Sequence, residues 1–118
     1  MISTELILNT VIEEAKKEKG IVSIKSRFGN EYDRPDTIIL KGKKKSKITP
    51  DLVIAFKNRT DLYLVEQEAD YNIVKWRLLA LYALKMKGNL YIVAPKDYEL
   101  HIAGKLKDSG INARMILF

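Results

Sequence analysis

Residues 49–68 read TPDLVIAFKNRTDLYLVEQE, and this stretch decides the fold. Two apolar runs flank a short polar segment, which predicts an antiparallel β-hairpin. Asp51 stands just before the first strand, and Glu66 and Glu68 stand at the end of the second. The hairpin therefore brings three carboxylates to its open end.

The length of the turn determines which of these side chains face one another. A two-residue turn at 58–59 places Asp51 opposite Glu66, whereas a four-residue turn at 58–61 places it opposite Glu68. Because side chains alternate between the two faces of a strand, Glu66 and Glu68 share a face in either register. Any even-length turn therefore puts all three carboxylates on one face.

A three-residue turn would instead place Gln67 opposite Asp51 and break the cluster. Where the cluster forms, its like charges destabilise the sheet, and a bound divalent cation would relieve that cost. Magnesium and similar hard cations prefer carboxylate oxygens. The alternative interpretation is structural: Asp51 caps a turn after Pro50, and residues 66–70 form a solvated strand end and an acidic helix N-terminus.

The composition indicates one globular domain over residues 1–118, long enough to bury a core. Cysteine is absent, which excludes disulfides and thiolate zinc sites. No signal-peptide pattern opens the sequence, and the apolar segment around 78–84 is too short and interrupted to span a bilayer. We therefore expect a cytoplasmic protein with no membrane partner.

The net charge of +6 is concentrated in residues 21–60, which hold ten basic and four acidic side chains. A basic stretch beside an acidic cluster suits a site that handles phosphodiesters, because phosphate contacts supply much of nucleic-acid affinity. The alternative is a solvated lysine-rich loop. The candidate nucleic-acid contacts are Arg27, Lys41, Lys43, Lys44, Lys45 and Lys47.

Apolar periodicity and turn residues give the remaining elements. The expected elements are a helix from Ser3 or Thr4 to Glu18, strands at 21–26 and 37–40, the hairpin, a helix from Asp70 or Asn72 to Lys87, a strand at 90–94, a helix at 95–108 and a strand at 111–118. The apolar residues of the second helix cover nearly its whole circumference, so we expect it to be buried on most sides. The class is α/β or α+β, a central mixed sheet flanked by helices in the order αββ(β)βαβαβ.

Pro50-Asp51 and Glu66-Gln67-Glu68, separated by the hairpin, resemble the motif of the PD-(D/E)XK nuclease superfamily. The core of that family is helix, three strands, helix, strand, which the expected order matches over residues 3–95. Residues 50–55 are similar to those of archaeal Holliday-junction resolvases, which are small, basic and begin with a helix. The resemblance implies a restriction-endonuclease-like core, Mg²⁺ or Mn²⁺ as cofactor, and DNA as partner, with branched DNA as one candidate substrate.

One position departs from the family, because Glu68 stands where the motif has lysine. Some type II restriction endonucleases resemble this chain in carrying Glu-x-Glu and are active. By the resemblance, Asp51, Glu66 and the backbone carbonyl of Gln67 would bind the metal. Glu68 would then act as a general base or a further metal contact. Lys75, early in the next helix, is the alternative source of the missing lysine, or else an exposed cation.

Many family members also use an acid from the first helix. Glu14, or failing that Glu5, would supply it here; the alternative is that either is a surface charge. The resemblance favours a metal-dependent endodeoxyribonuclease. The alternatives are a nucleic-acid-binding module that has lost catalysis through Glu68, and an interaction protein that forms a homodimer through its apolar end at 115–118.

Overall fold

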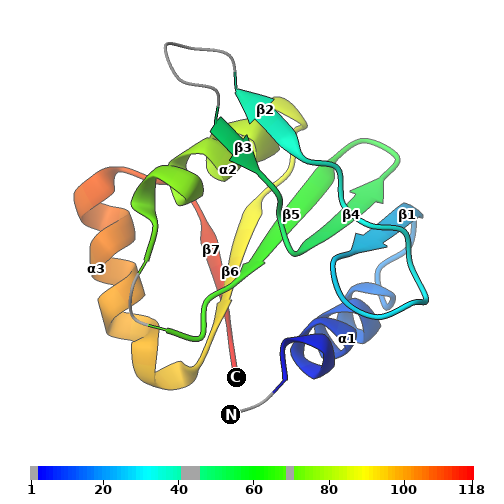
Figure 1. The fold of residues 1–118 in the computed structure, drawn as a ribbon, viewed down its shortest axis with the longest axis horizontal. Helices are drawn as coiled ribbons and strands as arrows, with labels where there is room; N and C mark the ends of the chain where they lie inside the picture. Colours follow the sequence, from blue (N-terminus) through cyan, green and yellow to red (C-terminus); the bar gives the residue numbers. More distant parts are fainter. Residues whose placement is uncertain (1–2, 41–45, 69–70) are drawn as a thin grey trace.

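A computed structural model of the chain describes residues 3–40, 46–68 and 71–118. Its centre is a five-stranded sheet with the spatial order β1-β4-β5-β6-β7 (Figure 1). The elements are α1 (Thr4–Ala15), β1 (Ile21–Ser26), β2 (Ile38–Leu40), β3 (Ser46–Ile48), β4 (Leu52–Phe56), β5 (Thr60–Val65), α2 (Ile73–Lys85), β6 (Leu90–Ala94), the 3-10 helix η1 (Lys96–Tyr98), α3 (Glu99–Ser109) and β7 (Arg114–Leu117). The α+β class with a mixed sheet, predicted from the sequence, is confirmed.

The sheet changes direction at β5. Strands β1, β4 and β5 pair antiparallel, whereas β5, β6 and β7 pair parallel through the crossover helices α2 and α3. The open end of the β4–β5 hairpin and the carboxyl end of β6 therefore lie at the same end of the sheet, where these central strands terminate. Helix α2 follows β5 in the chain, and its N-terminus lies at this same end of the sheet (Figure 1).

Each face of the sheet carries its own hydrophobic core. Helix α1 packs on one face, where Leu8 and Ile12 meet Leu52, Ile54 and Tyr63. Helices α2 and α3 cover the other face (Figure 1). Their buried residues, together with those of the strands below them, are Trp76, Leu79, Ala83, Ile102, Leu106, Leu62, Leu64, Leu90 and Ile92. The alternation along β5 thus assigns Leu62 and Leu64 to the α2 face and Tyr63 to the α1 face.

Local sequence signals explain where the helices begin and end. The Ser3 hydroxyl accepts a hydrogen bond from the Leu6 N–H at 3.2 Å and caps α1. The Asn72 side chain accepts one from the Lys75 N–H at 3.1 Å and caps α2; Asp70, the other predicted start, lies outside the described residues. Gly110, at φ 64°, closes α3 in the left-handed conformation that glycine adopts readily.

The prediction that α2 is buried on most sides is wrong. The exposed fractions of Val74, Leu81 and Leu84 are 60%, 58% and 68%. The sheet, α3 and the β2–β3 hairpin cover only part of the helix, so the rest of its apolar circumference faces solvent. An all-round apolar helix thus leaves an apolar surface stripe in this fold.

The β4–β5 turn also differs from both even-length registers that we considered. The Phe56 N–H donates to the Arg59 carbonyl at 2.8 Å, so the turn residues are Lys57 and Asn58. Leu52 consequently pairs with Tyr63, which places Asp51 beside Leu64 instead of Glu66 or Glu68. The turn is still of even length, so the predicted sharing of a face survives: Glu66 is the next residue after Leu64 on the face of Asp51.

The end of the sheet remote from Asp51 is held by a network of charges. The buried Asp61 carboxylate accepts hydrogen bonds from the Asn89 N–H at 2.9 Å and from Arg59 Nε at 3.2 Å. Arg59 also donates to Glu18 at 2.8 Å, which ties the segment after α1 to the turn. Beside this network Gly88 approaches the strand so closely that a Cβ would lie 1.8 Å from the Thr60 carbonyl oxygen.

Strands β2 and β3 form a separate antiparallel hairpin that is inserted between β1 and β4 in the sequence. Ile38 and Ile48 anchor this hairpin in the core on the α2 side of the sheet. Strand β3 falls where we expected a lysine-rich loop. The predicted nucleic-acid contacts Lys41, Lys43, Lys44 and Lys45 lie outside the described residues. Among the helices that the structure describes, none combines the length and apolar composition needed to cross a membrane.

Candidate functional site

Asp51 joins three strands at the open end of the hairpin. It is only 5% exposed, and its Oδ2 accepts a hydrogen bond from the Val65 N–H at 2.8 Å. Its Oδ1 pairs with Arg27 Nη1 at 3.3 Å, and its backbone carbonyl accepts from the Arg27 N–H at 2.9 Å. The carboxylate is therefore fixed in position, with one oxygen on the backbone and the other on a cation that is 55% exposed.

Glu66 extends from the carboxyl end of β5 on the same face. Its N–H donates to the Val93 carbonyl at 2.8 Å, so the backbone is still held in the sheet. Burial raises the pKa of the Glu66 carboxyl, while the Trp76 indole N–H and the Lys75 ammonium lower it and the Asp51 charge raises it again. The net shift of this pKa is upward, because burial disfavours the charged carboxylate more than Trp76 and Lys75 favour it.

The structure also brings Lys75 to this place. Lys75 lies in the first turn of α2, half-buried, and its ammonium favours the ionised form of Glu66. The same side chain lines a groove with Lys47, Thr49 and Asn72, between β3 and the N-terminus of α2. Two lysines and the positive end of a helix dipole make this groove attractive to an anion. Arg27, predicted as a nucleic-acid contact, pairs with Asp51 in this structure, and its predicted role stays a prediction.

The predicted group of three carboxylates is represented by two. Glu68 is exposed, two residues beyond Glu66 and past the end of β5. Within residues 3–40, 46–68 and 71–118, no three aspartate, glutamate or histidine side chains stand close enough together to hold a metal ion. The acidic part of the candidate site is therefore the pair Asp51 and Glu66.

Gln67 forms hydrogen bonds through both its side chain and its backbone carbonyl. Its side-chain Nε2 donates to the Thr4 hydroxyl at 3.0 Å, and its carbonyl, the expected metal ligand, accepts from the Tyr98 hydroxyl at 3.2 Å. The carbonyl oxygen therefore already has a protein partner. The Thr4 contact has a second consequence, because it places the N-terminus of α1 beside the site.

The two candidate acids of α1 are accordingly separated. Glu14 is exposed and pairs with Lys17 at 2.9 Å, about 15 Å along the helix from Thr4 at 1.5 Å per residue. Glu5 follows Thr4 directly, and its Oε1 lies 3.1 Å from where a Cβ on Gly29 would stand. Gly29 belongs to the loop that follows Arg27. Of the two acids, Glu5 is the one near the Asp51 end of the sheet.

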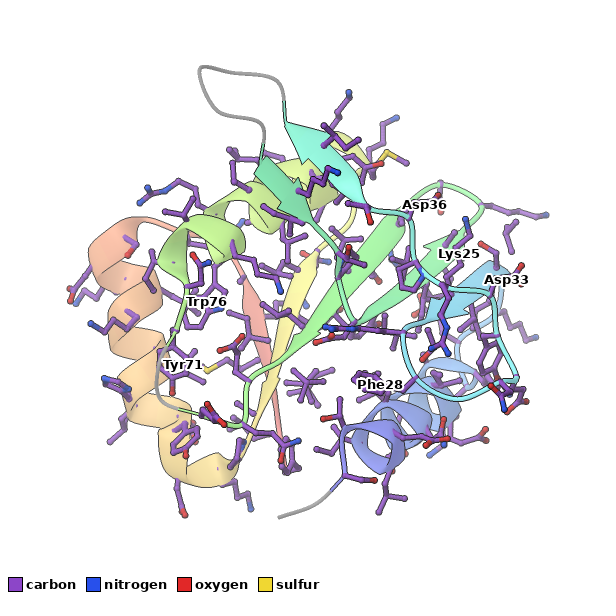
Figure 2. All side chains as sticks on the ribbon, viewed as in Figure 1. Lys25, Phe28, Asp33, Asp36, Tyr71 and Trp76 are labelled. Carbon is purple, nitrogen blue, oxygen red and sulfur yellow. The ribbon has the colours of Figure 1, made fainter. Side chains whose placement is uncertain are left out.

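Sequence reasoning missed the aromatic wall of the site. Tyr71 and Trp76 lie together at the start of α2, with ring centroids 5.0 Å apart (Figure 2). Tyr98 and His101 lie 6.5 Å and 5.3 Å from Tyr71. At the level of the sequence, the apolar residues of this helix form one group, in which Trp76 has no separate role. The available signal was its position directly after Lys75.

Comparisons of the chain with protein-family models, with curated proteins and with solved structures found no match. The functional argument therefore depends on the residues of the site.

Proposed function

We propose that this chain is a metal-dependent endonuclease of the PD-(D/E)XK type, with a restriction-endonuclease-like core, that hydrolyses phosphodiester bonds in DNA. The observation that carries the proposal is that Asp51, Glu66 and Lys75 lie together at one end of the central strands of the sheet. Two carboxylates and a lysine are the groups that the motif requires. Here the lysine comes from α2 instead of the position of Glu68.

The residues fit a magnesium or manganese ion. Mg²⁺ is commonly held by one or two carboxylates together with waters and substrate phosphates, so a pair of carboxylates suffices. Asp51 and Glu66 would hold it; the pKa of Glu66 is raised mainly by burial, and the nearby Asp51 charge adds to that rise. When bound, such an ion polarises a phosphoryl oxygen and lowers the pKa of a water.

The protein groups have separate tasks in this proposal. Asp51 is pre-positioned by the Val65 N–H, so little conformational freedom is lost on binding. Lys75 stands beside Glu66, where an ammonium can orient a water and offset the negative charge that develops on the phosphate. Arg27 neutralises Asp51 in the unliganded protein, and a cation on Asp51 would release its guanidinium to a phosphate.

The charge distribution supports a nucleic-acid substrate. Lys47 and Lys75 line the groove at the N-terminus of α2, and the segment 21–60 carries the whole excess of positive charge. If Lys43, Lys44, Lys45 and Lys47 contact phosphates, their neutralisation weakens DNA binding across sequences and lowers the salt slope by about one per lost contact. An unchanged slope would show that these lysines serve solubility instead.

The decisive experiment is cleavage of plasmid, linear and four-way-junction DNA with Mg²⁺, Mn²⁺ or a chelator. We expect cleavage only with metal, and its loss in Asp51→Asn. The matched control is Glu13→Gln, which alters an exposed α1 carboxylate whose partner is Lys16. Absence of cleavage on every substrate with either metal would refute the endonuclease proposal.

A second experiment assigns the lysine role. Lys75→Ala should slow cleavage by about 10²–10⁴-fold, the range for a group that assists proton transfer, while DNA binding weakens little. Glu68→Gln tests whether the exposed carboxylate acts as the base instead. Full activity in both variants would show that neither residue takes part in the reaction.

The second candidate is an interaction protein that forms a homodimer. The observation that favours it is the exposed apolar stripe of α2, where Leu81 and Leu84 line a groove with Ile111. A DNA-binding module without catalysis is the intermediate case. Sedimentation of the unmodified protein and of Leu84→Lys tests the dimer, and salt-dependent DNA binding without cleavage would identify the module.

A further inference from the structure

The single tryptophan of the chain has a buried hydrogen-bond donor without a partner. Trp76 is fully buried, and among the described residues its indole Nε1–H has no acceptor at hydrogen-bond geometry. Buried donors are rarely left unpaired, because the lost hydration is not replaced. A donor kept in this state suggests that an acceptor reaches it in another state of the site.

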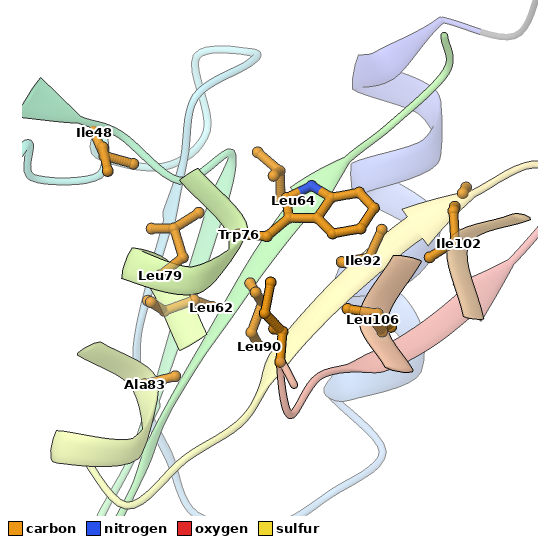
Figure 3. Packing of buried hydrophobic residues seen from close by; sticks show 12 residues of the cluster. Ile48, Leu62, Leu64, Trp76, Leu79, Ala83, Leu90, Ile92, Ile102 and Leu106 are labelled. Carbon is orange, nitrogen blue, oxygen red and sulfur yellow. The ribbon is translucent and has the colours of Figure 1, made fainter. Parts of the chain in front are cut away.

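The candidate acceptor is the Glu66 carboxylate, which is close enough for the indole N–H to lower its pKa although the two groups do not meet at hydrogen-bond geometry. Leu62 and Leu64 of β5 belong to the same core cluster as Trp76, and Glu66 is the next residue on that face. Figure 3 shows the indole ring beside Leu64, with its nitrogen at the edge of the cluster. The Glu66 backbone is fixed by the hydrogen bond from its N–H to the Val93 carbonyl, so the carboxylate can approach the indole N–H by rotation about its side-chain torsions.

Tyr71 strengthens the assignment. Its hydroxyl is also buried without a partner among the described residues, and its ring packs on Trp76. Burial, then Tyr98, then the charge of Glu66 raise the pKa of Tyr71, which places its hydroxyl within electrostatic reach of that carboxylate. Among the described residues, two buried donors without partners thus lie within electrostatic reach of the half-buried Glu66 carboxylate.

We propose that the indole N–H of Trp76 holds the Glu66 carboxylate in the orientation that binds a divalent cation, so that Trp76 is a positioning residue of the site. This inference rests on the proposed metal site at Asp51 and Glu66. An ionised carboxylate has about four lone-pair positions, so one oxygen accepts the indole N–H while the other faces the cation. Metal-ligating carboxylates are commonly hydrogen-bonded by such outer partners.

The test uses the fact that one tryptophan gives one indole N–H signal in a ¹H–¹⁵N NMR spectrum. Addition of Mg²⁺ to the unmodified protein should move this signal downfield as the hydrogen bond forms. In Glu66→Gln the same Mg²⁺ additions should leave it in place. The measurement requires no variant at Trp76 and no DNA.

Calorimetry then measures the contribution of the donor to affinity. Trp76→Phe keeps an aromatic ring but lacks the N–H, and we expect Mg²⁺ or Mn²⁺ affinity to fall about 10- to 100-fold, the usual cost of losing an outer partner. The matched control is Leu79→Ala, which removes a fully buried side chain of the same cluster that has no donor. It should lower stability and leave the affinity of the folded protein unchanged.

The outcomes separate this inference from the proposed function. Metal binding that Glu66→Gln abolishes, with an unmoved indole signal and an unchanged affinity in Trp76→Phe, would overturn the role of Trp76 and leave the metal site intact. Equal losses of affinity in Trp76→Phe and Leu79→Ala would make the role of Trp76 merely structural. Absence of metal binding by the unmodified protein would overturn both.

Discussion

Asp51 is predicted to have two roles that two substitutions can separate. In Asp51→Asn the amide oxygen still accepts from the Val65 N–H, but the charge facing Arg27 is lost. A hydrogen bond to a charged group contributes about 1.5–3 kcal/mol and a neutral one about 0.5–1.5, so the change costs about 1 kcal/mol. The partly exposed ion pair adds at most about 1 kcal/mol more.

Asp51→Ala removes the acceptor altogether. The Val65 N–H then remains unpaired in a part-buried position, which costs a further 1–3 kcal/mol or thereabouts. We therefore expect melting temperatures in the order unmodified protein, Asp51→Asn, Asp51→Ala. Successive steps should be about 3–6 °C or larger for a domain of this size.

The assay combines thermal unfolding with metal titration. Both variants should lose Mg²⁺ binding and cleavage, although Asp51→Asn keeps most of its stability. Equal melting temperatures for the two variants would refute the role of the Val65 hydrogen bond. Undiminished metal binding in Asp51→Asn would refute the site itself.

Three further predictions concern Arg27, Glu66 and Gly88. Arg27→Gln should tighten Mg²⁺ binding at Asp51, by at most about fivefold for a partly exposed pair, yet weaken DNA binding and lower its salt slope by about one; effects of the same sign in calorimetry and DNA titration would contradict this. Because the pKa of Glu66 is raised in the fold, its protonated form stabilises the unliganded protein below the unfolded pKa, and this stability is lost as pH rises through the folded pKa. Glu66→Gln should therefore raise the unliganded melting temperature at pH 7 and flatten its pH dependence, and an unaltered pH profile would argue against it. Gly88→Ala should destabilise the fold by about 3 kcal/mol, near the upper end for overpacking, because a Cβ meets the Thr60 carbonyl; wild-type stability in chemical denaturation would show that the loop yields.

The hairpin shows how far sequence reasoning reaches. Alternation requires only that the turn be even, so the shared face of Asp51 and Glu66 could be predicted without knowing the register. The register itself could not be predicted, because it depends on the contacts that Arg59 makes. Its side chain binds Asp61 within the hairpin and Glu18 from the segment after α1, a contact across 41 positions that no local pattern encodes.

For the rest of the fold and the site, single elements could be predicted from the sequence, but contacts between distant elements could not. The strands 21–26 and 90–94 were predicted with their observed bounds, because their apolar runs are bounded by clear turn residues. The pairing of Arg27 with Asp51 and the aromatic wall at Trp76 depend on which strands are neighbours. Strand β1 joins β4 across the whole excursion from 27 to 51, and composition alone does not indicate that order.

That excursion has a consequence for how such a protein can diversify. Asp51 and Glu66 flank the continuous β4–β5 hairpin, whereas the β2–β3 hairpin is inserted before it; among the described side chains of that insertion, Ile38 and Ile48 pack in the core. Changes in the length or charge of residues 41–45 would therefore leave the Asp51–Glu66 geometry untouched. If the proposed nuclease function holds, this insertion is the part of the chain where preference for one nucleic-acid shape over another can change during evolution without loss of the chemistry, and it is a suitable place to graft a new recognition loop.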